Sequence, residues 1–140
     1  MTTTEEQLFE PIDMENWSRA QSFYYYTQIA PTTYSITVSM DVTVLRKELK
    51  IRGLKFFPAY LWLVTRAIQE GEELRVGVMD GVLGHWKRLI PVYPQFHEDD
   101  RSTSLLWTEY YDNFSKFYQC YCSDIREYGD NHGILTSKGI

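Results

Sequence analysis

The stretch NWSRAQSFYYYTQIAPTTYSITVSMDV, residues 16–42, carries the strongest structural signal in this chain. In its first half, the spacing of the aromatic residues would place them on one face of a helix. In its second half, after Pro31, apolar and polar residues alternate. A period of two is typical of a strand with one buried face. The apolar positions are Tyr34, Ile36, Val38, Met40 and Val42. We therefore predict an amphipathic helix over residues 15–27 and a long strand over residues 33–42.

The rest of the chain mixes helical and strand patterns. Asp80-Gly81 between two alternating runs predicts a β-hairpin. The broad apolar surface of residues 55–71 predicts a helix buried against a sheet. Residues 9–12 are expected to form a short strand or an extended arm. Further elements are expected as a helix over 44–51 with Thr43 as its N-cap, strands over 89–96 and 102–107, and a helix over 114–128 capped by Asp112. The order predicts a single α/β domain over residues 1–140, of the α+β sandwich type.

Composition excludes several classes of function. The net charge is −5 and no Lys/Arg run occurs, so no nucleic-acid partner is predicted. No apolar run approaches the roughly 20 residues that span a bilayer, so no membrane association is predicted. The N-terminus lacks the basic and apolar regions of a signal peptide, and we expect a cytoplasmic location. Aromatic residues make up 16% of the chain, including 11 Tyr, which suits a binding cavity or an interface.

No local catalytic motif is present, whether GxSxG, a phosphate loop, GxGxxG or HExxH. His85, within the hairpin, is expected to pack on a sheet or face solvent, and His97 ends a strand. His132 is expected to be solvated, and the acidic run 98–100 is interpreted as a solvated loop. We predict no catalytic residue and no metal site. The residues alone thus indicate a soluble α/β domain with an aromatic-rich face.

A set of residues spread along the whole chain nevertheless matches a known order and spacing. They are Asn16-Trp17-Ser18-Arg19, Phe23, Tyr25-Tyr26, Phe56-Phe57-Pro58, Glu73-Leu74-Arg75, Asp80-Gly81, Trp86, Phe96-His97, Ser104-Leu105, Trp107, Tyr110, Asp112, Phe117, Tyr121 and Lys138-Gly139. Together they resemble the type A chloramphenicol acetyltransferase family. The resemblance implies a mixed sheet flanked by helices, a homotrimer, and acetyl transfer from acetyl-CoA to a hydroxyl of chloramphenicol. It also implies active sites between subunits, with the histidine of an HHxxxDG motif as general base.

The resemblance also implies an acceptor-binding pocket. Its members here would be Tyr25, Tyr26, Ala30, Thr32, Tyr34 and Thr103. Thr103 departs from the family pattern, which has Phe there, and would leave one wall smaller and more polar. Arg19 matches an arginine that pairs with the aspartate of HHxxxDG.

HHxxxDG itself does not occur in these 140 residues, which correspond to the N-terminal two-thirds of the family pattern. The resemblance thus implies a truncated protein that lacks the general base and has no activity by itself. Acetyl-CoA would be a co-substrate only if the missing part were supplied, and no cofactor-binding residue is assigned. The alternative is a non-catalytic module that binds an aromatic small molecule or a protein partner covering the exposed sheet.

Overall fold

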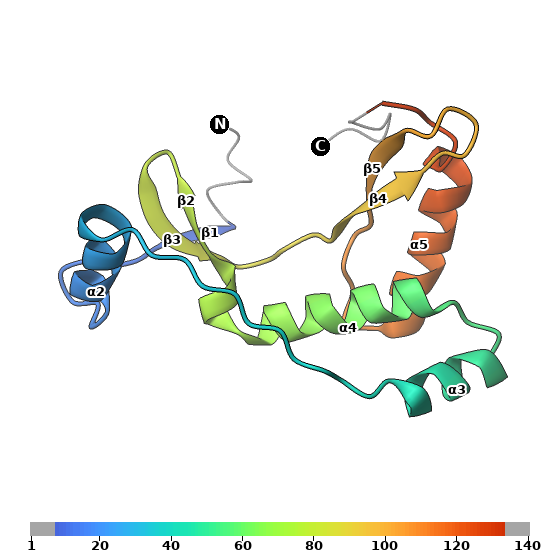
Figure 1. Cartoon of the computed structure of the whole chain (residues 1–140), viewed down its shortest axis with the longest axis horizontal. Helices are drawn as coiled ribbons and strands as arrows, with labels where there is room; N and C mark the ends of the chain where they lie inside the picture. The colour runs from blue at the N-terminus through green and yellow to red at the C-terminus, as the bar shows by residue number, and fades with distance from the viewer. Residues whose placement is uncertain (1–7, 134–140) are drawn as a thin grey trace.

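The computed structural model describes residues 8–133 and shows an α+β fold of helices and small antiparallel sheets (Figure 1). Lys138 and Gly139 of the family pattern lie outside the described residues. The elements in chain order are β1 (Phe9–Pro11), α2 (Ala20–Tyr24), the π-helical η1 (Tyr25–Ile29), α3 (Thr43–Ile51), α4 (Phe56–Glu70), the 3₁₀-helical η2 (Glu72–Arg75), β2 (Val76–Met79), β3 (Val82–Trp86), β4 (Val92–Phe96), β5 (Thr103–Trp107) and α5 (Phe114–Tyr128).

The strands form two separate sheets, with the orders β1-β3-β2 and β4-β5. The predicted hairpin is confirmed: β2 and β3 pair antiparallel, and Asp80 and Gly81 turn between them with φ of 51° and 81°. Such positive values at both central residues are the reason that Asp-Gly favours this turn. Every strand pair among residues 8–133 is antiparallel, so the parallel pairs of a mixed sheet are not seen in this part of the chain.

The main core lies where the β4-β5 sheet meets α5 and the start of α4. Phe117 of α5 and Leu106 of β5 are fully buried there. Phe57 packs its ring against Tyr93 and Tyr121, at centroid distances of 5.9 and 6.2 Å. The aromatic stripe predicted for residues 114–128 is therefore the inner face of α5.

Helix α4 is found where it was predicted, but the expectation that a sheet buries it is wrong. It packs against α5 and η2. The Trp62 indole N–H also donates to the carbonyl of Tyr111, in the connection between β5 and α5, at 2.8 Å. Tyr60 and Leu63 remain 48% and 42% exposed. One side of its broad apolar surface therefore faces α5. No described residue covers the other side.

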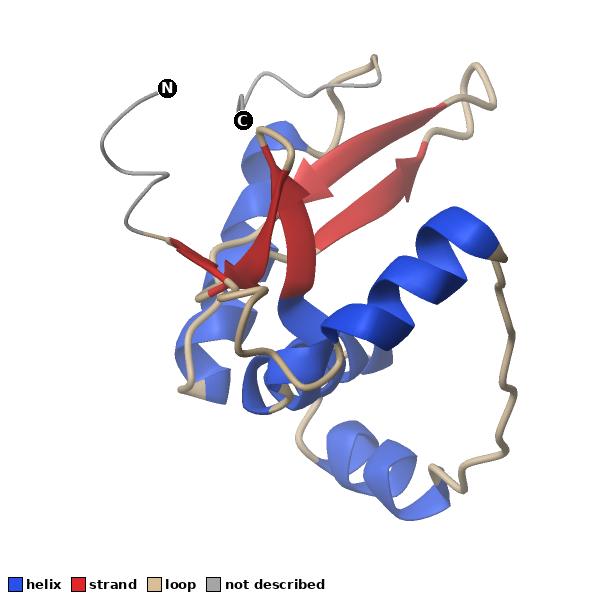
Figure 2. Ribbon diagram, turned by 90° about the vertical axis from the view of Figure 1, so that its left-hand side faces the viewer, coloured by secondary structure: helices blue, strands red, loops and turns tan. Residues whose placement is uncertain are grey.

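The long strand predicted over residues 33–42 is not formed. These residues are extended, but none has a strand partner among residues 8–133. They run as an isolated connection from η1 to α3 (Figure 2). The apolar side chains remain exposed: Tyr34 86%, Ile36 76%, Val38 75% and Met40 80%. A strand requires a neighbour for its N–H and C=O groups, and alternation in one segment cannot supply that neighbour.

The helix predicted over residues 15–27 also differs. Residues 14–19 form turns, α2 begins at Ala20, and the helix widens into η1 before Ala30. Two predicted caps are displaced along the chain. Val42, not Thr43, is the N-cap residue of α3, and its side chain makes no capping hydrogen bond. The Asp41 carboxylate, just before it, accepts the N–H of Thr43 at 2.9 Å. Asn113, not Asp112, caps α5 by accepting the N–H of Lys116.

Candidate functional site

An open groove of about 1010 Å³ is lined by residues of the turns before α2, of α2, η1 and η2, and of the β2-β3 hairpin. These elements lie at one end of the molecule (Figure 1). The volume of the groove is at the upper end of the range for small-molecule sites. One wall is aromatic and the other is polar. The lining residues are Trp17, Arg19, Ser22, Phe23, Tyr26, Thr27, Thr32, Tyr34, Glu72, Glu73, Val76 and His85.

Three of the six predicted acceptor-pocket residues, Tyr26, Thr32 and Tyr34, line this groove. Tyr25 does not line it, but its ring meets that of Tyr26 edge-on at 5.2 Å. Thr103 lies on β5, at the opposite end of the molecule from α2 (Figure 1). The structure therefore groups the first part of the predicted pocket and leaves Thr103 apart from it.

The aromatic wall is shaped by the π-helical turn of η1. The Ala30 N–H donates to the Tyr25 carbonyl at 2.8 Å, a five-residue step that widens the helix and places Ala30 at its end. The Thr32 N–H then donates to the Tyr26 carbonyl at 3.1 Å. The Thr32 hydroxyl donates to the Ala30 carbonyl at 2.7 Å. These contacts fix the chain direction between Tyr26 and Tyr34, and π-helical turns are frequent at functional sites.

The polar wall was not predicted from the sequence. His85 of β3 faces Glu72 of η2, with 3.5 Å between Nε2 and a carboxylate oxygen. His85 Nδ1 is buried and has no hydrogen-bond partner among residues 8–133. Arg19 and Glu73 complete the charged groups. Glu72 and His85 are 13 positions apart, and only the hairpin brings them together, so no local motif marks this pair.

The arrangement can bind a ligand but carries no recognisable reaction centre. Aromatic rings offer apolar area, while Tyr and Thr hydroxyls and the charged wall offer hydrogen bonds. The closest resemblance to a nucleophile and base is elsewhere: His97 Nε2 and the Ser104 hydroxyl are 2.8 Å apart. Both residues are buried, so a substrate cannot reach the Ser104 oxygen.

Comparisons with known proteins agree with this architecture. The family model described as chloramphenicol acetyltransferase matches residues 7–139. A chloramphenicol acetyltransferase of Staphylococcus aureus is 40% identical over 133 residues, which cover 94% of this chain and 61% of the relative. One of Clostridium perfringens is 38% identical over 132 residues, covering 94% and 60%. A solved chloramphenicol acetyltransferase structure superposes with a TM-score of 0.82 at 25% identity, covering 90% of this chain and 59% of that one.

The fold is thus that of an acyltransferase family. The chain belongs to the chloramphenicol acetyltransferase family, and it spans about 60% of the length of the relatives it matches. No helix among the described residues is long and apolar enough to cross a membrane.

Proposed function

We propose that this chain forms the acceptor-binding side of an enzyme that transfers an acetyl group from acetyl-CoA to a hydroxyl of a chloramphenicol-like acceptor. The observation that supports this function is the groove, because Tyr26, Thr32 and Tyr34 of the resemblance line it together. The aromatic ring of an acceptor would pack on Tyr26 and Tyr34. Its hydroxyl groups would bind the Thr32 hydroxyl and the polar wall.

The chemical step requires a group that these 140 residues do not contain. The general base of the family pattern is the histidine of HHxxxDG, and that motif is not in the sequence. Loss of a general base alone lowers a rate by about 10²–10⁴. The 140-residue chain therefore binds the acceptor without acetylating it. A segment that carries the motif would have to be supplied to complete the site, and the resemblance pairs the aspartate of that motif with Arg19.

A binding titration tests the acceptor site. Trp17 lies in the groove, so its fluorescence reports a ligand that enters. Chloramphenicol should change the emission saturably. Tyr26→Ala should weaken binding by about tenfold or more, because it removes a large aromatic contact surface. Tyr60→Ala on α4 is the matched control, since it removes an exposed Tyr outside the groove. Equal effects of the two substitutions would overturn the assignment.

A thiol-release assay tests the chemical step separately. Acetyl-CoA and chloramphenicol should give no release of CoA thiol above background with the 140-residue chain. The full-length Staphylococcus aureus relative serves as the positive control. Turnover by the 140-residue chain would show that a base other than the HHxxxDG histidine acts in it.

The second candidate is a non-catalytic interaction module. It is favoured by one observation, the row of exposed apolar side chains from Tyr34 to Met40. Such a row on an extended segment favours association with another chain. Concentration-dependent self-association without chloramphenicol binding would favour the module, whereas a monomer that binds chloramphenicol would favour the acceptor-binding role.

A further inference from the structure

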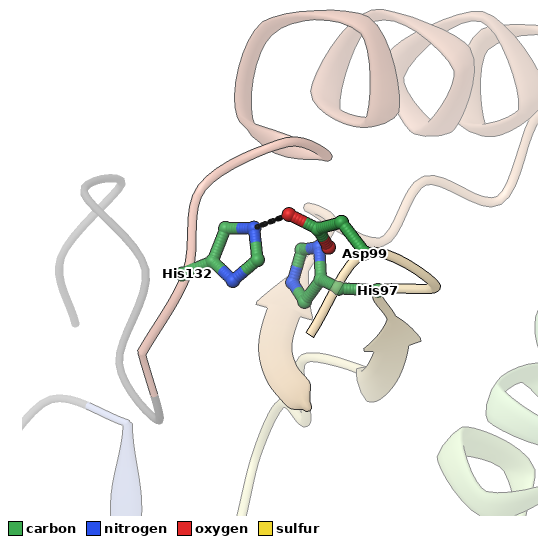
Figure 3. Close-up of side chains that lie close together, drawn as sticks. All are labelled: His97, Asp99 and His132. Carbon is green, nitrogen blue, oxygen red and sulfur yellow. Dashed lines mark ion pairs between the residues drawn. The ribbon is translucent and has the colours of Figure 1, made fainter. Parts of the chain in front are cut away.

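A cluster of two histidines and an aspartate lies beside the end of α5 (Figure 3). The β4-β5 sheet next to it is at the opposite end of the molecule from α2 (Figure 1). His97 and Asp99 belong to the connection between β4 and β5, and His132 follows α5. One potential ligand atom from each of the three residues lies within 4.8 Å of the others. The histidines are 35 positions apart, which explains why no ligand spacing was visible in the sequence.

Each histidine is oriented by a second polar group. His97 Nε2 and the Ser104 hydroxyl are 2.8 Å apart in the buried core, which leaves Nδ1 toward Asp99. His132 Nδ1 is 2.8 Å from a carboxylate oxygen of Asp100, while Nε2 is 3.3 Å from Asp99 Oδ2. Metal-binding histidines characteristically use one ring nitrogen for the ion and hold the other with a carboxylate or similar partner.

We propose that His97 Nδ1, His132 Nε2 and the Asp99 carboxylate form a binding site for a divalent transition-metal ion of the zinc class. Two imidazoles and one carboxylate are a ligand set that suits Zn²⁺, and a water molecule would complete a tetrahedron. Ser104 and Asp100 are positioning residues that do not touch the ion.

Asp100 is suited to this positioning role. Its Oδ1 accepts the Ser102 N–H at 2.9 Å, which fixes the carboxylate beside His132. Its Oδ2, 2.8 Å from His132 Nδ1, can accept the Nδ1 proton. That contact makes Nε2 the unprotonated nitrogen, which is the form that binds a metal.

Binding requires a small closure of the cluster. The rings of His97 and His132 stack with centroids 4.1 Å apart and 23° between their planes. Ligand atoms around a tetrahedral zinc ion lie only about 3.3 Å apart, given bonds of about 2.0–2.1 Å. His97 is buried and fixed, whereas the side chains of His132 and Asp99 are 40% and 71% exposed. His132 and Asp99 are therefore the side chains that move. Ion binding should tilt the His132 ring out of its stack with the His97 ring.

Titration of the 140-residue chain with Co²⁺ and Zn²⁺ tests the site. Co²⁺ should give a saturable visible absorption band of tetrahedral intensity, and Zn²⁺ should displace it. His132→Gln and Asp99→Asn should abolish the band. Glu98→Gln is the matched control, because it removes the same charge from the same loop outside the cluster. Asp100→Asn should weaken metal binding by about 10- to 100-fold, as does the loss of a group that hydrogen-bonds a metal-binding histidine.

Three results would overturn the proposal. Absence of a saturable Co²⁺ band would show that these side chains only contact one another and hold no ion. Unchanged affinity in His132→Gln, with a native circular dichroism spectrum, would place the ion elsewhere. A loss of binding in Glu98→Gln equal to that in Asp99→Asn would show general charge attraction and would also overturn it.

Discussion

The Tyr93 hydroxyl lies 2.8 Å from the Thr108 hydroxyl, and Thr108 in turn donates to a carboxylate oxygen of Asp124 at 2.7 Å. A hydroxyl has one hydrogen, so Tyr93 must be the donor in the first contact. This relay joins β4 and α5 through the residue that follows β5. Tyr93 and Thr108 are fully buried, so the relay is a polar link inside the main core.

The direction of these hydrogen bonds predicts that removing the Tyr93 hydroxyl and removing the Thr108 hydroxyl lower the free energy of unfolding by different amounts. Tyr93→Phe removes a donor and leaves Thr108 bound to Asp124, which should lower the free energy of unfolding by about 1 kcal/mol. Thr108→Val leaves the buried Tyr93 hydroxyl without an acceptor, and should cost more, about 1–3 kcal/mol. Urea unfolding of both variants measures the difference. A smaller loss for Thr108→Val than for Tyr93→Phe would contradict the assigned direction.

Burial of Tyr93 also predicts a loss of stability at alkaline pH. Desolvation raises the pKa of Tyr93, only partly opposed by the Thr108 hydrogen bond, and burial likewise raises the pKa of Tyr121. A folded pKa above the unfolded value of about 10 leaves stability intact below pH 10 and reduces it as pH rises further. The unfolding free energy should therefore fall above about pH 10. Tyr93→Phe should flatten that fall, and an identical pH profile in both proteins would refute the role of Tyr93.

Gly84 is predicted to hold β1 on the sheet. A Cβ added at Gly84 would lie 2.5 Å from the Glu10 carbonyl oxygen and 2.5 Å from the Phe9 ring. Gly84→Ala should therefore push β1 away from β3 and lower the free energy of unfolding by about 1–3 kcal/mol, as overpacking does. Val78→Ala, at an exposed position of the same sheet, is the control and should cost less. Exchange of the Ile12 amide hydrogen, which donates to the Leu83 carbonyl at 3.0 Å, should become faster in Gly84→Ala alone.

Local patterns in the sequence predicted most of the elements. The Asp-Gly turn, α3, α4, β5 and α5 all depend on contacts between near neighbours, such as turn geometry and the apolar stripe of residues 114–128. Both predicted cap positions were wrong by one residue, since Val42 precedes α3 where Thr43 was predicted and Asn113 precedes α5 where Asp112 was predicted. Only the backbone conformation decides which residue is the cap.

Features that depend on distant residues could not be predicted in this way. The pair of His85 and Glu72 and the cluster of His97 with His132 exist only because the chain folds back on itself. The resemblance to a family supplied Tyr26, Thr32 and Tyr34, which the groove brings together. The family resemblance also predicted Thr103 as a member of the pocket. Thr103 lies on β5, where its position is set by the pairing of β4 with β5, and this pairing does not place it near the groove.

The exposed row on residues 34–40 yields the last prediction. Ile36 and Val38 contact solvent over most of their surface, so a charge placed there should leave the unfolding free energy within about 0.5 kcal/mol. If this row draws two chains together, Ile36→Lys should shift the protein toward monomer in light scattering. Thr37→Lys is the matched control, since it adds the same charge on the opposite side of the extended segment. Monomer formation in both variants would attribute the effect to a lysine on either side of the segment, whereas monomer formation in Ile36→Lys alone would assign association to the apolar row.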